Sequence, residues 1–338
     1  MTRRAPLIAD FLNRAGWSGA CRTPLAGDAS SRRYERLTLG TRRAILMDAP
    51  PELGESTARF ARMALWLRGH GYSAPDILAE DHAAGLMLVE DLGDDLLSRV
   101  VNADPARETE IYLSACDLLL DLGTRSVPEF VAPLDAGGLG DLVAILADHH
   151  VRGLGGDPSA VADIPAIVTR LCATILDETR VVSLRDVNAD NLLWLPRRAG
   201  LARIGLLDFQ DAVAAHPVYD LVSLLQDARR DVGEDTGAAL RRHWCRRTGM
   251  DESTLDRQIA CLGAARALRI LGVFARLAMV HGKTRYLDMM PRVWAHLQAN
   301  LRHPALAPLN RAVLAGLNAP TMDRLDRLRT TCPRPRTP

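Results

Sequence analysis

The sequence has little lysine, little net charge and few aromatic residues. Only Lys283 among its 42 basic residues is a lysine, the acidic residues number 41, and aromatic residues make up 4% of the 338 positions. A formal charge of +1 gives no long-range attraction to nucleic acid or to an anionic membrane, so we expect neither as a partner. Because the chain has a single lysine, we expect arginine to fill roles that lysine usually has in enzymes.

Several common motifs are also absent. The six cysteines form no CxxC pair and no Cys/His set at zinc-ligand spacing, which predicts free thiols. No GxxxxGK[ST] occurs, which excludes a P-loop kinase. Asp10 and Asn13 interrupt the apolar N-terminal stretch, and we find no run near the roughly 18 to 20 apolar residues of a membrane span. The expectation is a cytoplasmic enzyme.

The N-terminal part of the chain has the pattern of a small β-rich lobe. Residues 5–15 form an amphipathic pattern, and residues 24–51 predict strands with a hairpin turn at Gly40-Thr41. A helix with apolar residues at 60, 63, 64 and 67 follows, and two further strands lie between 74 and 92. A chain of this length favours two domains, and we place the first at residues 1–92.

The rest of the chain has mainly helical periodicity. Helices are predicted at 108–122, at 161–180 and repeatedly after Tyr219, while the runs VVSL and IGLLDF suit short buried strands. This predicts an α+β protein with a β-rich first lobe and a mainly helical second lobe at 93–330. The proline-rich tail at 331–338 lacks apolar anchors and is predicted to be disordered.

The residues most indicative of chemistry lie in VVSLRDVNADNLLWL and in IGLLDFQDA. An apolar strand leads to Asp186, Asn191 follows five residues later, and a second apolar strand ends at Asp208. Magnesium bound to a triphosphate takes hard oxygen ligands, which Asn191 and Asp208 supply. Asp186 would then accept the proton of an attacking hydroxyl in phosphoryl transfer. The alternative is that all three are turn formers or strand-end caps.

These segments, with GDASSRRY, ILMDAPPE, YDLVSLLQDARRDV and LGVFARLAMVHGKTRYLDMMPR, carry a family resemblance. The chain resembles the aminoglycoside phosphotransferase/choline kinase branch of the protein-kinase-like superfamily. More narrowly, it is similar to the bacterial N-acetylmuramate/N-acetylglucosamine anomeric kinases of cell-wall recycling. The resemblance implies a bilobal kinase-like fold, ATP and Mg²⁺ as cofactors, and a small-molecule acceptor that is an amino sugar phosphorylated at its anomeric hydroxyl.

The resemblance also implies a nucleotide site in the first lobe. The loop from Gly27 to Tyr34 would approach the phosphates, and its cofactor-binding residues would be Gly27, Ser30, Ser31, Arg32 and Arg33. Protein kinases carry a phosphate-binding lysine on the third strand, but AILMDAPP has Met47 and Asp48 there. Arginine is a good phosphate ligand, and we favour Arg32 or Arg33 for this task over Arg42 or Arg43.

The connection between the lobes would bind adenine through its main chain. It reads LMLVEDLGD, and the implied cofactor-binding residues are Glu90 and Leu92. In the second lobe, the resemblance implies that Asp220 braces the catalytic loop, although a helix-capping role is also open.

The chain departs from the family pattern at one position of the catalytic loop. The family usually has H-x-D-x4-N, and Leu184 stands in place of the histidine. This departure and the missing lysine leave open a nucleotide-binding pseudokinase, and an aminoglycoside or a choline-like alcohol remains an alternative acceptor. Five further residues keep two interpretations each, contact with substrate or metal against a structural role: Asp190, Asp211, His149, His150 and Lys283.

Overall fold

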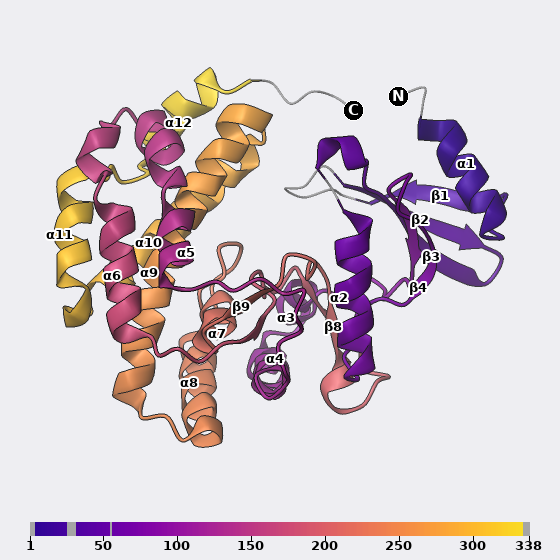
Figure 1. Ribbon diagram of the computed structural model, residues 1–338, viewed down its shortest axis with the longest axis horizontal. Coiled ribbons are helices and arrows are strands. Elements are labelled where there is room, and N and C mark those ends of the chain that lie inside the picture. Colours follow the sequence, from indigo (N-terminus) through magenta and orange to yellow (C-terminus); the bar gives the residue numbers. More distant parts are fainter. Residues whose placement is uncertain (1–3, 26–31, 55, 334–338) are drawn as a thin grey trace. The chain divides into compact units, whose positions relative to one another are not determined.

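The computed structural model describes residues 4–25, 32–54 and 56–333 and divides by packing into two compact units (Figure 1). Unit 1 comprises Met1–Pro105 and Ala189–Ala212, and unit 2 comprises Ala106–Asn188 and Val213–Pro338. The lobe boundaries at residues 92 and 330 stay predictions. The packing adds that residues 189–212 group with the N-terminal part of the chain.

A five-stranded antiparallel sheet in the order β1-β2-β3-β5-β4 forms the main layer of unit 1. Its strands are β1 Cys21–Pro24, β2 Arg33–Leu39, β3 Arg42–Asp48, β4 Ile77–Asp81 and β5 Leu86–Val89. The predicted turn between β2 and β3 is confirmed, because Leu39 pairs with Arg42 across Gly40-Thr41. Gly40 has a φ of 61°, a conformation that glycine adopts without a Cβ clash.

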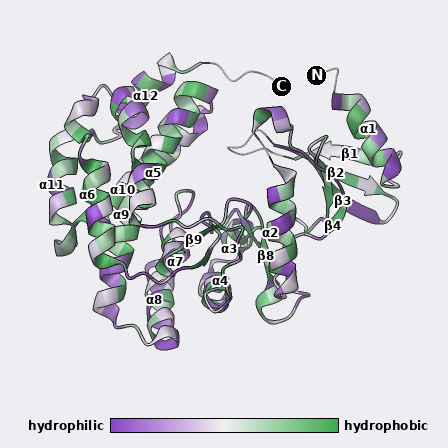
Figure 2. Ribbon diagram, in the orientation of Figure 1, coloured by the Kyte–Doolittle hydropathy of each residue, from purple (hydrophilic) through white to green (hydrophobic). Residues whose placement is uncertain are grey.

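Two helices of unit 1 follow from the sequence pattern. Helix α1 (Arg4–Arg14) buries Ile8, Phe11 and Leu12 in one apolar cluster with residues of β2, β3 and β5. Helix α2 (Thr57–Gly69) begins at Ser56, whose hydroxyl accepts from the Arg59 amide as an N-cap. Figure 2 shows hydrophobic and hydrophilic segments alternating along α1, as expected for a helix that buries one face.

Unit 1 also contains a short hairpin made by residues distant in sequence from its main sheet. Strand β7 (Leu192–Trp194) pairs with β8 (Ile204–Leu206), and helix α3 (Leu97–Ala103) packs on β7. Ser73 forms a parallel bridge with Gly205, and the Leu206 amide donates to the Ser73 carbonyl at 2.9 Å. These bonds explain why 189–212 belongs to unit 1.

Unit 2 is mainly helical, as predicted. Its α-helices are α4 Glu108–Leu122, α5 Ala136–Val143, α6 Ile164–Ile175, α7 Val218–Leu225, α8 Glu234–Thr248, α9 Glu252–His281, α10 Met290–Leu301, α11 Ala307–Gly316 and α12 Met322–Thr331. One two-stranded element interrupts them, in which β6 (Val181–Ser183) pairs with β9 (Val213–Ala215). The predicted α+β class is confirmed.

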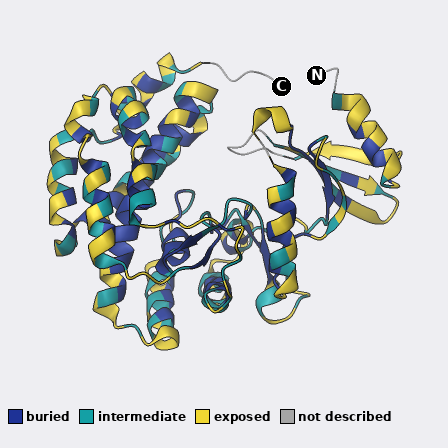
Figure 3. Ribbon diagram, in the orientation of Figure 1, coloured by how far each residue is buried: buried dark blue, intermediate teal, exposed yellow. Residues whose placement is uncertain are grey.

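Helix α9 is the central helix of unit 2. Asp251 caps its first turn by accepting from the Thr254 amide, and Gly282 ends it with a φ of 66°. Helices α5, α6, α7 and α10 all pack against it, and most residues along its middle are buried (Figure 3). Each large apolar side chain buried in this way contributes about 1.5–3 kcal/mol to stability.

Two segments reach the length and mean hydropathy of a membrane span, although neither is an uninterrupted apolar run. Pro158–Ile175 has a mean hydropathy of 1.2 and is 22% buried, and Glu252–His281 reaches 1.4 and is 83% buried. Short polar interruptions divide each apolar stretch. The burial of the second is that of a core helix.

Two further predictions concern the C-terminal tail and the cysteines. Thr331, the first residue of the tail predicted to be disordered, is instead the last residue of α12, and residues 334–338 lie outside the described residues. All six cysteines are free thiols, as predicted.

Candidate active site

The predicted base, Asp186, follows a strained loop in unit 2. Strand β6 ends at Ser183, Leu184 is buried, and Arg185 has a φ of 72°. A non-glycine residue in this left-handed region costs roughly 1–3 kcal/mol of conformational free energy, and surrounding contacts are needed to hold it there. The Asp186 side chain itself is 43% exposed, so solvent and solutes can reach its carboxylate.

Asp220 on α7 holds this loop from the protein interior. Its carboxylate accepts from the Ser183 hydroxyl at 2.7 Å, from the Leu184 amide at 2.6 Å and from the Arg185 amide at 3.0 Å. Burial raises the pKa of Asp220 to about 6, although these three bonds and the charge of Arg266 favour its ionised form. The implied bracing role matches this geometry, and Asp220 lies in the first turn of α7 as the sequence indicated.

Arg266 is a residue of this loop environment that sequence reasoning missed. It lies on α9, its side chain is 7% exposed, and it donates to the Arg185 carbonyl at 2.8 Å and to the Ser223 hydroxyl at 2.8 Å. The available signal was an arginine amid the apolar run IACLGAARALRILGVF, where a charge needs a buried partner.

Leu184, which stands in place of the family's histidine, is buried. It is 4% exposed, and its amide donates to Asp220. The loop is thus held by bonds that do not require a side-chain donor at position 184.

The two predicted metal ligands lie together in unit 1. Leu192 pairs with Leu206 in the β7–β8 hairpin, and the Leu207 amide donates to the Asn191 carbonyl at 2.9 Å. Asn191 therefore lies across the hairpin from the residue that precedes Asp208. Asp208 has a φ of 55° and a side chain that is 47% exposed.

This donor set fits magnesium that arrives with a nucleotide. Within the described ranges, no group of three or more His, Cys, Asp or Glu side chains could hold a metal ion by itself. Magnesium bound to a triphosphate needs only one or two protein oxygens, because phosphate and water oxygens complete its octahedron. A carboxylate from Asp208 and an amide oxygen from Asn191 match that requirement.

The structure distinguishes the candidate phosphate-binding arginines. Arg32 is largely buried, with a side chain 9% exposed, and its Nη1 lies 3.8 Å from Asp208 Oδ1. Arg33 is exposed at the start of β2, and the Arg42 guanidinium stacks over the Trp17 ring at 4.3 Å. Of these, Arg32 is the one associated with a predicted metal ligand.

The other residues predicted near the nucleotide phosphates have different outcomes. Gly27, Ser30 and Ser31 lie outside the described residues. On β3, where kinases have their lysine, Met47 is buried and Asp48 pairs with Arg4.

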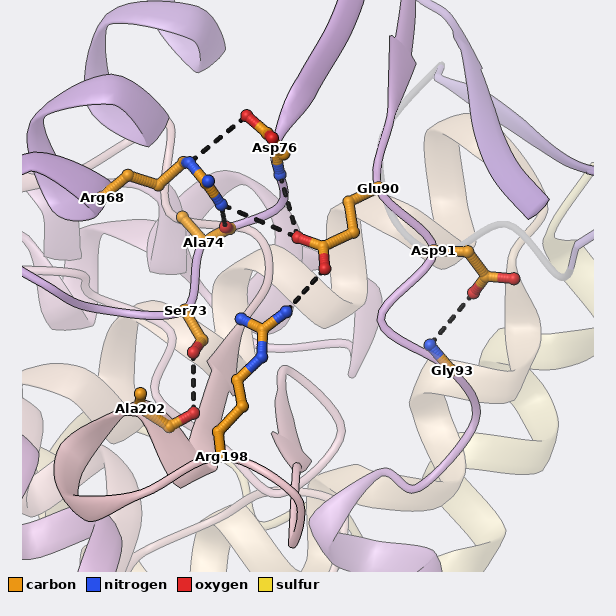
Figure 4. Close-up of polar contacts among 9 residues, drawn as sticks. All are labelled: Arg68, Ser73, Ala74, Asp76, Glu90, Asp91, Gly93, Arg198 and Ala202. Carbon is orange, nitrogen blue, oxygen red and sulfur yellow. Dashed lines mark hydrogen bonds and ion pairs between the residues drawn. The ribbon is translucent and has the colours of Figure 1, made fainter. Parts of the chain in front are cut away.

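The segment predicted to bind adenine is fixed by side-chain contacts (Figure 4). Glu90 Oε1 accepts from Arg198 at 2.5 Å, Glu90 Oε2 accepts from the Asp76 amide at 3.2 Å, and the Glu90 amide donates to the Asp76 carbonyl at 2.8 Å. Asp91 accepts from the Gly93 amide at 3.0 Å. Glu90 thus anchors the segment by its side chain, while Leu92 is half-buried. The adenine-binding role of both stays a prediction.

Four of the residues with two interpretations have structural contacts. Asp190 accepts from the Ser98 hydroxyl, and Asp211 pairs with Arg59 at 3.3 Å. His150 is fully buried in a π-helical turn, Ala147–Val151, where its Nε2 lies 2.9 Å from the Asn318 carbonyl and its ring stacks on Trp294. Lys283 precedes a 3-10 helix, where its amide donates to the Leu277 carbonyl at 3.0 Å.

Curated relatives share most of the chain. It is 38% identical to the N-acetylmuramate/N-acetylglucosamine kinase of Caulobacter vibrioides, over 91% of this chain and 95% of that protein. It is 32% identical to the protein of the same name from Pseudomonas aeruginosa, over 87% of this chain and 88% of that one. The resemblance inferred from the sequence motifs is confirmed.

Solved structures and a family profile agree with this result. Choline kinase LicA from Streptococcus pneumoniae has a TM-score of 0.62 at 12% identity, covering 87% of this chain and 98% of that one, which shows the shared fold. The profile described as the phosphotransferase enzyme family matches residues 22–260, well over half of the chain. The chain therefore belongs to the phosphotransferase enzyme family.

Proposed function

We propose that this enzyme transfers the γ-phosphoryl group of ATP to the anomeric hydroxyl of N-acetylmuramate or N-acetylglucosamine, in the recycling of cell-wall sugars. The relatives that share most of its length are named for these two sugars. The acceptor is a small molecule, and an aminoglycoside or a choline-like alcohol is the competing choice.

One structural observation carries the assignment of residues. Among the described residues, only Arg185 and Asp208 are non-glycine residues with a φ in the left-handed region. One directly precedes the predicted base, and the other is a predicted metal ligand. Backbone strain of this kind concentrates at functional sites, because only a required geometry keeps it there. Turn formation alone would not explain this coincidence.

Four residues have distinct proposed roles in the phosphoryl transfer. Asp186 accepts the proton of the acceptor hydroxyl, and Asn191 with Asp208 would hold Mg²⁺. When bound, Mg²⁺ neutralises charge on the β- and γ-phosphates. Arg32 supplies the cation that a third-strand lysine gives in protein kinases, since its planar guanidinium can bind phosphate through two donors.

ADP release with ATP and Mg²⁺ tests the proposal, using N-acetylmuramate, N-acetylglucosamine, an aminoglycoside and choline as acceptors. Sugar-dependent release is expected, and Asp186→Asn should lower kcat about 10²–10⁴-fold, the usual contribution of a general base. Asp326→Asn, an exposed carboxylate on α12 of the same unit, is the matched control and should retain activity.

A second assay separates the anomeric hydroxyl from the others. Phosphorylation at the anomeric oxygen removes the reducing end, so the reducing-sugar signal should fall in step with ADP release. ADP release with the reducing signal unchanged would move the reaction to another hydroxyl. Turnover with choline or an aminoglycoside only would replace the acceptor, and ATP binding without turnover would indicate a regulatory pseudokinase.

A further inference from the structure

Arg266 is a buried cation whose hydrogen bonds go to neutral groups. It sits in the middle of α9, and its two bonds at 2.8 Å reach a backbone carbonyl and a serine hydroxyl. Burying a guanidinium costs several kcal/mol unless nearby groups compensate for the lost hydration. A leucine or methionine would suit the apolar helix better, so the charge needs a reason beyond packing.

The surroundings keep this guanidinium charged. Burial opposes the charged form, but Tyr219, Asp186 and Asp220 act against it, and the net effect raises the pKa of Arg266. The guanidinium also lies over the Tyr219 ring, 5.4 Å from its centroid. Arg266 is therefore a permanent positive charge beneath the catalytic loop.

The strained residue Arg185 is held at both ends of its main chain. Its amide donates to Asp220 Oδ1 at 3.0 Å, and its carbonyl accepts from Arg266 Nη1 at 2.8 Å. These two bonds fix the peptide groups on either side of a residue with a φ of 72°. Removing the Arg266 bond would let Arg185 relax to a commoner conformation and would turn the following residue away.

The same nitrogen of Arg266 lies near the predicted base. Nη1 is 3.9 Å from Asp186 Oδ1, which is longer than a hydrogen bond but within the range of charge attraction. The guanidinium thus attracts the carboxylate without a close bidentate pair, while the backbone bond to Arg185 sets the direction in which Asp186 points.

We propose that Arg266 is the positioning residue of the catalytic loop, holding Arg185 in its left-handed conformation so that Asp186 is oriented for proton transfer. The inference builds on the proposed role of Asp186. It explains how a loop with Leu184 keeps its geometry, because a cation from α9 restrains the main chain where the family usually has a scaffold histidine.

Two substitutions of Arg266 separate charge from geometry. Arg266→Gln removes the charge, and Arg266→Lys keeps it but replaces the planar fork by a single amine, which cannot match both acceptors. We expect kcat to fall about 100-fold or more in Arg266→Gln and about 10-fold in Arg266→Lys, with the KM for ATP within about threefold of wild type. A purely structural role would not produce this split between kcat and KM.

Arg230 offers a matched control in the same unit. It is a largely buried arginine, paired with Glu108 at 2.7 Å, donating to the Tyr112 hydroxyl at 2.7 Å and lying over the Tyr112 ring. Arg230→Gln should lower the thermal midpoint by an amount similar to Arg266→Gln while kcat per folded enzyme stays within about threefold. Equal loss of kcat in both variants would overturn the proposal, as would an unchanged kcat in Arg266→Gln.

Amide hydrogen exchange gives a readout that does not depend on turnover. Residues 184–188 should exchange at least about tenfold faster in Arg266→Gln than in wild type, and no faster in Arg230→Gln. Unchanged exchange in this loop would refute the positioning role whatever the substrate is. Faster exchange in an enzyme that phosphorylates no sugar would retain the role of Arg266 and reject the proposed acceptor.

Discussion

The two segments that carry the predicted chemistry are held in place by different forces. The loop before Asp186 in unit 2 depends on polar bonds from two buried charged residues, Asp220 and Arg266. The strand end at Asp208 in unit 1 adds apolar packing to its polar contacts: Phe209 is fully buried and packs on Phe60 with ring centroids 4.8 Å apart, and Gln210 donates to Asp208 Oδ1 at 2.8 Å. A directional bond fixes an orientation, whereas apolar packing fixes the position of the chain.

Asp220→Asn tests the polar contacts that hold the loop before Asp186, and it should have the largest effect. An asparagine keeps one acceptor oxygen and turns its NH2 donors toward either the Leu184 amide or the Arg185 amide, and it removes a negative charge near Arg266. We expect about 3–5 kcal/mol lower stability in urea unfolding and a kcat reduced about 100-fold. Normal kcat in the folded variant would show that the loop keeps its shape without Asp220.

Phe209→Ala tests the apolar side. Loss of a fully buried phenylalanine removes its contact with Phe60 and should cost about 3 kcal/mol. The Mg²⁺ concentration that gives half-maximal activity should rise about tenfold, because Asp208 loses the anchor beside it. Phe209→Leu, which keeps most of the volume, should show a small part of both effects. A destabilised variant with an unchanged Mg²⁺ requirement would limit Phe209 to a core role.

The acid response should sharpen the comparison, since unit 2 contains buried ionisable groups. Burial lowers the pKa of His216, just after β9, to about 4, while the charge of Asp177 opposes this and that of Arg180 adds to it. Between pH values of about 4 and about 6.5, the imidazole of His216 is protonated in the unfolded chain but not in the folded state. The free energy of unfolding therefore falls as the pH drops from about 6.5 to about 4, by up to about 3 kcal/mol.

Two other groups contribute to the same pH window. Burial also lowers the pKa of His150 to about 4, which adds to the loss. The raised pKa of Asp220 acts in the opposite sense, because its contribution to stability increases as the pH falls from about 6 to about 4. His216→Gln should flatten the fall of the urea midpoint between pH 6.5 and 4, and substitution of the exposed His281 should not. An identical slope in both variants would contradict this account.

The smallest effect concerns the arginine beside Asp208. Arg32→Gln should raise the KM for ATP about tenfold, equivalent to about 1.4 kcal/mol, with little change in the KM for sugar. Arg33→Gln is the natural control, because Arg33 is adjacent in sequence but exposed at the start of β2. A larger effect at Arg33 than at Arg32 would reverse the assignment of the phosphate-binding cation.

Local sequence patterns were enough to predict much of the fold. The helices at 108–122 and near 57–69, the turn at Gly40-Thr41 and the mainly helical second part all follow from spacing and turn chemistry. The short strands β6 and β8 were predicted from their apolar runs, whereas β7 and β9, which are equally short, were not. The grouping of 189–212 with the N-terminal residues was also missed, since it depends on bonds to residues such as Ser73.

The sequence by itself determined the identities of the predicted base and metal ligands, since Asp186, Asn191 and Asp208 lie at fixed spacings after apolar strands. Only the tertiary structure decided how the catalytic loop is held. The Leu184 amide donates to Asp220, 36 residues away, and the Arg185 carbonyl accepts from Arg266, 81 residues away. Local patterns report which face of an element is apolar, but they do not encode which distant polar groups will meet. Burial strengthens these hydrogen bonds and charge interactions, because a buried charge without a partner would destabilise the fold.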